Sequence, residues 1–266
     1  MNSLNKKKLF KLFKLYLHYI TIPFRILFII VTYFILLFIL VIINDRNIDN
    51  NLIYYANKIL MLLLSVNIIY DKDNLEILNK YINSDTKFII IFNHTNLIEP
   101  FLLLSLFKNI SFLLNPELPS YLPFFDVIYK KFNFIYTKNG NTTDKIINYT
   151  NDRKNGESAL AIAPGEGRPS DNPDENNITK FKSGAFVGLL PILPIVIKFE
   201  DVFVDYNFDK GEYFLHALLK IFLKQKHNVK VKVLELVHPN KNESINDYKD
   251  RIRDIMSKEY NKYTKM

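Results

Sequence analysis

The chain opens with a long apolar stretch and continues with short apolar runs separated by polar segments. Residues 26–43 read ILFIIVTYFILLFILVII and contain no charged side chain. About 18 such residues suffice for a helix that crosses the hydrocarbon core of a bilayer. The sequence after them, Asn44-Asp45-Arg46, lacks the small residues of a signal-peptide cleavage site, so we expect the segment to be retained.

Helical patterns flank this apolar segment on both sides. Ahead of it, Lys7, Lys11, Lys14 and His18 recur at three- and four-residue steps with apolar residues opposite, which is typical of a helix at a membrane surface. After it, residues 52–69 are apolar with polar interruptions. This second pattern fits a helix that lies against membrane or protein better than one that spans lipid, and the two helices could form a hairpin.

We therefore divide the chain into a membrane-anchoring segment, residues 1–69, and a globular domain, residues 70–266. The basic N-terminus is expected on the cytoplasmic side by the positive-inside rule. We expect N-terminal attachment to a membrane, which in a eukaryotic cell would be the endoplasmic reticulum or another endomembrane. The alternatives of a spanning segment and a re-entrant hairpin both stay open at this point.

Beyond residue 70, short β-rich runs alternate with helical patterns, which predicts an α/β fold with a mixed sheet flanked by helices. Prolines at 191 and 194 favour an edge strand or an irregular entry for the apolar run that ends at Phe199. A serine and an aspartate, Ser244 and Asp247, form a capping pair for the last helix. The expected strands cover 87–92, 110–114, 134–137, 158–163, 191–199 and 229–237, and the expected helices cover 100–107, 122–132, 143–151 and 244–260.

Charge and composition narrow the chemistry. The 266 residues carry 35 Lys and Arg against 27 Asp and Glu, a net charge of +8, and no Cys. Without cysteine there are no disulfides, thiolate metal sites or cysteine nucleophiles. Together with the apolar segment, the positive charge favours membrane lipids and phosphorylated substrates over nucleic acid as partners, with an ordinary solvated basic surface as the alternative.

The strongest candidate for chemistry is His94, which lies between an expected strand and an expected helix, with Glu99 five positions later. Within one helix the two side chains would point about 140° apart, but they can meet if His94 precedes the helix. A histidine oriented by a carboxylate can act as a general base. No serine is placed as a nucleophile, so the proton would come from a substrate hydroxyl. The alternative is a loop histidine with a purely structural hydrogen bond.

A second candidate is the turn Pro164-Gly165-Glu166-Gly167-Arg168, which follows an expected strand and offers backbone N–H groups and a carboxylate where α/β proteins bind ligands. An ordinary turn is the alternative. Three basic residues could line a phosphate site beside it, although single surface cations are usually only solvated. They are Lys138, Arg168 and Lys182.

Taken in order, these elements resemble the motifs of the glycerolipid (lysophospholipid) acyltransferase family, the PlsC-like enzymes. The resemblance covers roughly residues 55–260 and looks most like the lysophosphatidylcholine and lysophosphatidylethanolamine acyltransferase branch. Asn93-His94 with Glu99 resembles the family's N-H-x4-D motif, and residues 134–138 resemble the motif ending in Phe-Ile-x-Arg. Residues 164–168 resemble the third motif, Phe-Pro-Glu-Gly-Thr-Arg. The fourth motif, the Lys-x-Gly-Ala-Phe segment and its proline-rich strand, resembles residues 182–186 with Pro191 and Pro194.

The resemblance implies that residues 70–266 form a catalytic domain with the glycerol-3-phosphate acyltransferase-like fold. It implies acyl-CoA as co-substrate, a lysophospholipid or glycerol phosphate as acceptor, and neither a metal ion nor a bound cofactor. His94 would be the general base and Glu99 its partner. The residues implied for substrate binding are Asn93, Lys138, Glu166, Gly167, Arg168 and Lys182.

Four positions depart from the family motifs: Glu99 replaces Asp, Lys138 replaces Arg, Gly165 replaces Pro, and Arg168 falls one place early in the third motif. The longer carboxylate arm shifts its reach by about 1.5 Å. A membrane-anchored lipid-binding protein of the same fold that has lost turnover is therefore the first rival interpretation. A lipid hydrolase is the second, disfavoured because no Gly-x-Ser-x-Gly nucleophile elbow occurs.

Overall fold

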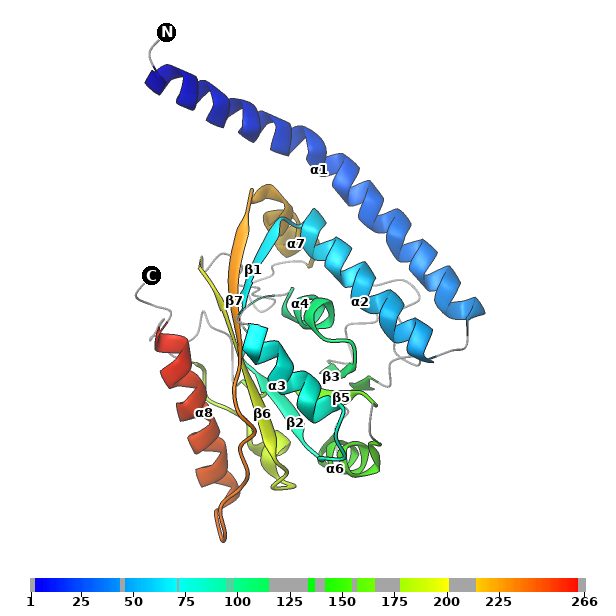
Figure 1. Ribbon diagram of the computed structural model, residues 1–266, viewed down its shortest axis with the longest axis vertical. Coiled ribbons are helices and arrows are strands. Elements are labelled where there is room, and N and C mark those ends of the chain that lie inside the picture. Colours follow the sequence, from blue (N-terminus) through cyan, green and yellow to red (C-terminus); the bar gives the residue numbers. More distant parts are fainter. Residues whose placement is uncertain are drawn as a thin grey trace.

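A computed structural model describes residues 3–43, 46–70, 72–94, 96, 98–114, 134–136, 142–154, 157–165, 178–200 and 214–262. Within these ranges seven strands form one sheet in the order β1-β7-β6-β2-β5-β3-β4 (Figure 1). Every neighbouring pair is parallel except β6 with β7. The strands are β1 (Val66–Tyr70), β2 (Ile89–Phe92), β3 (Ile110–Leu114), β4 (Ile135–Tyr136), β5 (Ala159–Ile162), β6 (Ile192–Phe199) and β7 (His227–Val233).

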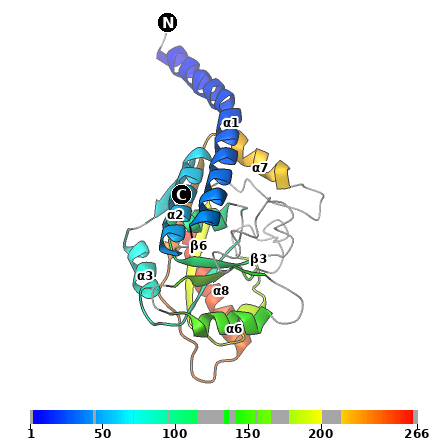
Figure 2. The same ribbon diagram turned by 90° about the vertical axis from the view of Figure 1, so that its right-hand side faces the viewer.

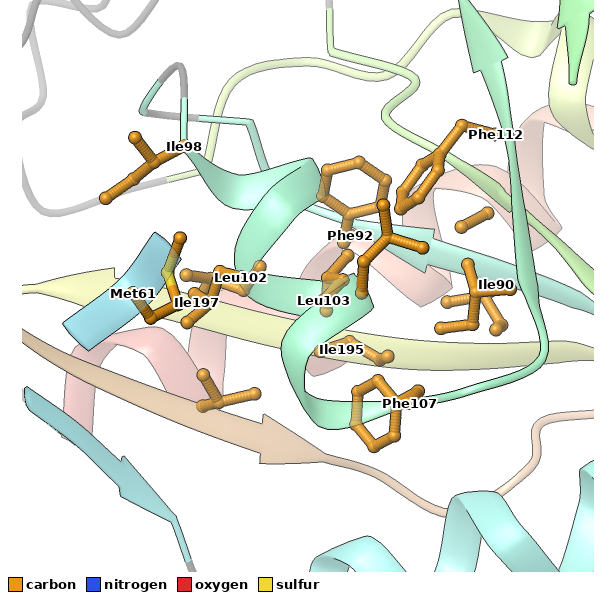
Figure 3. Packing of buried hydrophobic residues seen from close by; sticks show 14 of the residues in the cluster. Met61, Ile90, Phe92, Ile98, Leu102, Leu103, Phe107, Phe112, Ile195 and Ile197 are labelled. Carbon is orange, nitrogen blue, oxygen red and sulfur yellow. The ribbon is translucent and has the colours of Figure 1, made fainter. Parts of the chain in front are cut away.

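Helices cover both faces of the sheet, which confirms the predicted mixed α/β class. One core cluster joins the sheet to α2, α3, α4 and α7, and the other joins it to α6, α8 and the short helix η3. Figure 3 shows Met61 of α2 beside Leu102 of α4 and Ile197 of β6. The helices are α1 (Ser3–Ile42), α2 (Arg46–Leu63), α3 (Lys72–Ile82), α4 (Glu99–Leu106), α6 (Thr142–Asp152), η3 (Ser183–Phe186), α7 (Phe214–Leu223) and α8 (Ile245–Lys262).

The basic amphipathic pattern and the apolar segment form one continuous helix, α1, with Pro23 inside it. One stripe of α1, including Ile22, Leu37 and Leu40, is buried, while most other apolar side chains of the helix are exposed. Among the described residues, Leu12–Ile42 is the one stretch long and apolar enough to cross a membrane, and only 11% of its most apolar part is buried. The N-terminal apolar helix predicted from the sequence is therefore present.

The helix expected over 52–69 is shorter than predicted. It ends at Leu63, and Ser65 turns the chain in a left-handed conformation with φ 57°. The apolar residues that follow form β1, because they find a partner strand in β7. The division at residue 69 stays a prediction, although β1 crosses it. The helix expected over 122–132 lies outside the described residues.

β6 is not an edge strand, so the first of the two alternatives drawn from Pro191 and Pro194 is wrong. Its irregular start opposite β7 fits the second alternative. β6 lies between β2 and β7. The Pro194 carbonyl accepts the Leu234 N–H at 2.9 Å. The nitrogen of Pro194, which carries no hydrogen, therefore also faces β7. Regular pairing with β7 spans Ile195 to Phe199 and stops before Pro194, so no ladder donor is lost there.

All seven described strands meet one edge of the sheet. β2, β3, β4, β5 and β6 end at this edge, and β1 and β7 begin there, because β7 runs antiparallel to β6. The His227 N–H donates to the Ser65 carbonyl at 3.0 Å and joins the two starting strands. We call this the carboxyl edge, after the ends of β2, β5 and β6. The opposite end is the amino edge.

The C-terminal helix follows the predicted capping. The Ser244 hydroxyl donates to Asp247 Oδ2 at 2.6 Å, and the Asp247 N–H donates back to Ser244 Oγ at 3.1 Å. Tyr248, Ile252 and Met256 then bury one stripe of α8 against β6. The polar remainder of this helix faces water, as its amphipathic pattern requires.

Candidate active site

The carboxyl edge carries a histidine and a glutamate in direct contact. His94 follows β2 by two residues, and Glu99 is the first residue of α4. The His94 Nδ1 and Glu99 Oε2 atoms are 2.6 Å apart. The Glu99 side chain is fully buried, whereas the His94 side chain is 52% exposed. The geometry therefore realises the predicted contact between a histidine outside a helix and a carboxylate at its start.

Two asparagines shape the turn that holds His94. The Asn93 amide donates to the Ile197 carbonyl at 2.7 Å and accepts the Ile197 N–H at 2.8 Å, which extends the contact between β2 and β6 beyond Phe92. Asn96 Oδ1 accepts the Ile98 N–H at 3.1 Å just before α4 begins. Asn93 is buried and positions the residue next to it, so its predicted contact with substrate stays a prediction.

The negative charge of Glu99 changes the pKa of His94. Burial lowers the pKa of His94, but the hydrogen bond that its Nδ1–H donates to Glu99 and the negative charge of Glu99 outweigh this effect. The pKa of the imidazole therefore lies above its ordinary value. A carboxylate on Nδ1 fixes the tautomer that carries its proton there and leaves Nε2 as the proton acceptor. A half-exposed imidazole of this kind can take a proton from a bound hydroxyl.

Two residues near this pair were missed in the sequence. The pKa of Tyr260 on α8 is raised by burial and by the charge of Glu99. Lys198, at the end of β6, lies with its Nζ 4.1 Å from the centre of the Tyr260 ring. Nothing in the local sequence links these positions to residue 99, since only the packing of α8 on β6 brings them to the carboxyl edge.

The third and fourth motif segments meet at the end of β5. The Lys182 N–H donates to the Pro164 carbonyl at 2.7 Å, and Gly165 forms an isolated bridge with Phe181. A Cβ on Gly165 would lie 2.8 Å from Thr179 Oγ1, so this close approach requires glycine. The side chain of Lys182 is exposed. The other predicted binding residues, Lys138, Glu166, Gly167 and Arg168, lie outside the described residues.

Within the described ranges, no group of three or more His, Asp or Glu side chains lies close enough to hold a metal ion. The expectations of no metal and no cofactor stay predictions. The chemistry available at the described part of the site is proton transfer at His94, supported by a buried carboxylate.

Comparison with known proteins agrees with this site. The sequence model of the Acyltransferase family matches residues 74–198, a range that contains His94, Glu99 and the end of β6. This part of the chain is therefore similar in sequence to the Acyltransferase family. The segment beyond the match adds β7 and α8, which complete the sheet and its second face.

The chain also resembles a solved structure over nearly its whole length. That structure is the 1-acyl-sn-glycerophosphate (LPA) acyltransferase PlsC from Thermotoga maritima, with a TM-score of 0.63 and 18% identity, covering 97% of each chain. At this identity the likeness establishes the PlsC-like fold. A search of curated proteins finds no match to the chain.

Proposed function

We propose that this chain is a membrane-bound O-acyltransferase that moves a fatty acyl group from acyl-CoA to the free hydroxyl of a lysophospholipid. The contact of 2.6 Å between half-exposed His94 and fully buried Glu99 carries the proposal. Candidate acceptors are lysophosphatidate, lysophosphatidylcholine and lysophosphatidylethanolamine. The first is supported by the similar structure from Thermotoga maritima, which is that of an LPA acyltransferase.

In this mechanism the acceptor hydroxyl gives its proton to His94 Nε2 as its oxygen attacks the thioester carbonyl carbon. The C–O ester bond forms, the C–S bond breaks, and the departing CoA sulfur receives the proton from the imidazolium. Glu99 stabilises the imidazolium between these two transfers because its carboxylate is already in hydrogen-bond contact with Nδ1. A positioned general base of this kind contributes about 10²–10⁴-fold to a rate.

Membrane attachment through α1 is part of the same proposal. The exposed apolar side chains of α1 fit lipid better than water, while its buried stripe packs on α2 and the core. Arg25 of α1 donates to the Leu63 carbonyl at 3.1 Å and to Ser65 Oγ at 3.2 Å, which ties the helix to the start of β1. This supports an α1–α2 hairpin held at the carboxyl edge, where both substrates would present their polar ends.

The test is acyl transfer from labelled acyl-CoA by the purified full-length chain to a panel of the three lysophospholipids and glycerol phosphate. We expect His94→Ala to abolish transfer, and Glu99→Asp to fall between the wild type and Glu99→Gln because its carboxylate retreats by about 1.5 Å. His238→Ala is the matched control, since His238 lies on the loop before α8 and should leave transfer unchanged.

Product analysis separates the rival functions. Released fatty acid in place of acylated acceptor would indicate a hydrolase. A folded wild-type chain that binds lysophospholipid but transfers nothing to any acceptor would overturn the acyltransferase proposal in favour of a lipid-binding protein.

A further inference from the structure

The helix α7 has one face buried in the core and another that the chain leaves uncovered. Ile221 and Phe222 are buried in the cluster beneath α4 and α2. Leu219 and Leu223 lie four residues apart on another face and are 48% and 50% exposed. Because the buried pair fixes the rotation of the helix, the two exposed leucines form a defined apolar ridge.

This ridge lies beside α1. His18 of α1 is next to the backbone of Phe222 and Leu223. Figure 2 shows α7 and α2 on either side of α1. α7 contacts α1 near its middle, and α1, whose 40 residues measure about 60 Å, also contacts α2. Exposed apolar side chains occur on all three helices. The exposed members on α2 are Tyr55, Ile59 and Leu62.

The charged residues within and just after the last turns of α7 are basic. Lys220, Lys224 and Lys226 lie within or just after the last turns of α7, and acidic residues are absent from 214–226. Leucines flanked by lysines match the boundary between the acyl chains and the anionic headgroups of a bilayer, where lysine side chains reach the headgroups and apolar side chains enter below them.

We propose that α7 is a second membrane-contacting element, in which Leu219 and Leu223 enter the same leaflet as the exposed face of α1. The inference rests on the proposed membrane association and deepens it. Attachment through the axis of α1 alone would leave the domain free to rotate about that axis. A second contact to one side of α1 removes this freedom. Because α7 leads directly into β7 at the carboxyl edge, the α7 contact also holds the edge that carries His94 toward the lipid.

The absence of Trp and Cys from the chain allows a direct test. Full-length variants with a single tryptophan are reconstituted with phosphatidylcholine–phosphatidylglycerol vesicles whose acyl chains are brominated. Leu223→Trp and Leu219→Trp report on α7, and Phe34→Trp reports on the exposed face of α1. Lys258→Trp, on the exposed side of α8 across the sheet, is the matched control. Circular dichroism checks that each variant is folded.

We expect a blue shift and bromine quenching of emission for Phe34→Trp and for both α7 reporters, with no quenching for Lys258→Trp. Removing phosphatidylglycerol should reduce the quenching of the α7 reporters by about twofold or more, because lysine attraction to anionic headgroups is lost. Quenching at Phe34→Trp without quenching at either α7 reporter would overturn the inference and leave the α1 anchor standing. Absence of quenching at all three positions would overturn membrane association as well.

Discussion

Two buried charges, Glu99 and Arg153, lie at opposite edges of the sheet and are balanced in different ways. The Arg153 guanidinium donates to the backbone carbonyls of Ile82, Thr86 and Glu157 at 2.6, 2.9 and 3.1 Å. Glu99 instead contacts an imidazole that is half open to solvent. A charge held by backbone carbonyls stays fixed, whereas a charge paired with an exposed, titrating group can support proton transfer. The type of partner thus separates a structural charge from a functional one.

The largest expected effect comes from Glu99→Gln, which removes the charge and keeps the shape. We expect turnover to fall by about 10²–10⁴-fold, as when the orienting carboxylate of a catalytic triad is neutralised. The stability of the fold should change little, since a neutral amide is cheaper to bury than a carboxylate. Steady-state kinetics and thermal unfolding measure the two effects. If Glu99→Gln is partly unfolded but its folded fraction keeps the wild-type turnover, Glu99 is a structural charge and not a functional one.

The converse is expected for Arg153→Met. It leaves one buried and two partly buried carbonyls without their donor, so we expect a loss of about 3 kcal/mol in the free energy of unfolding. Denaturant titration measures this loss. The neighbouring exposed Lys154→Met is the control and should stay within about 0.5 kcal/mol of the wild type. If the folded Arg153→Met protein lost turnover without losing stability, the contrast between the two charges would fail.

A smaller effect is expected from Gly165→Ala at the carboxyl edge. The added Cβ would lie 2.8 Å from Thr179 Oγ1, and such overpacking costs about 1–3 kcal/mol. Gly184→Ala is the matched control, because nothing lies within 4 Å of its added Cβ. Thr179→Ala in the Gly165→Ala background should restore stability by removing Oγ1. Equal stability of the two single alanine variants would contradict the close approach.

The smallest effect is a shift in pH dependence. The base must be neutral, and the pKa of His94 is raised by Glu99, so activity should rise with pH through a value above about 6.5. Glu99→Gln removes the charge, which should move this acid limb of kcat/KM to lower pH. The ion pair itself stabilises the fold below the unfolded pKa and loses that contribution as pH rises through the raised pKa. An acid limb that does not move in Glu99→Gln would exclude His94 as the titrating base.

The local pattern of the sequence predicted most helices and strands, but it did not predict which strands pair with each other. The apolar runs predicted β2, β5 and β6 because strands buried on both faces are apolar throughout. Residues 66–69 were expected to be helical, because the partner strand of β1 begins only at His227 and no local signal reports it. The central position of β6 was missed for the same reason, since Pro194 is acceptable only where β7 has stopped pairing.

At the site, the contact between His94 and Glu99 was predictable because it depends on one boundary, the start of α4 at Glu99. The bonds between Asn93 and Ile197 join residues 104 positions apart, and sequence spacing carries no information about them. Arg153 was not singled out at all, since its partners are backbone atoms that any residue could supply. Side-chain chemistry is readable from sequence, but the backbone partners that balance it are not.

The pairing of β1 with β7 also has a consequence for synthesis. Val66 lies opposite His227, 161 residues later in the chain. At about 5–20 residues per second, ribosomes need roughly 10–30 s to make that interval. During this time α1 and α2 have been made, while the strand that fixes their position does not yet exist. The apolar helix is thus available to a bilayer before the carboxyl edge is complete, and His94 meets its final surroundings only when the last third of the chain has emerged.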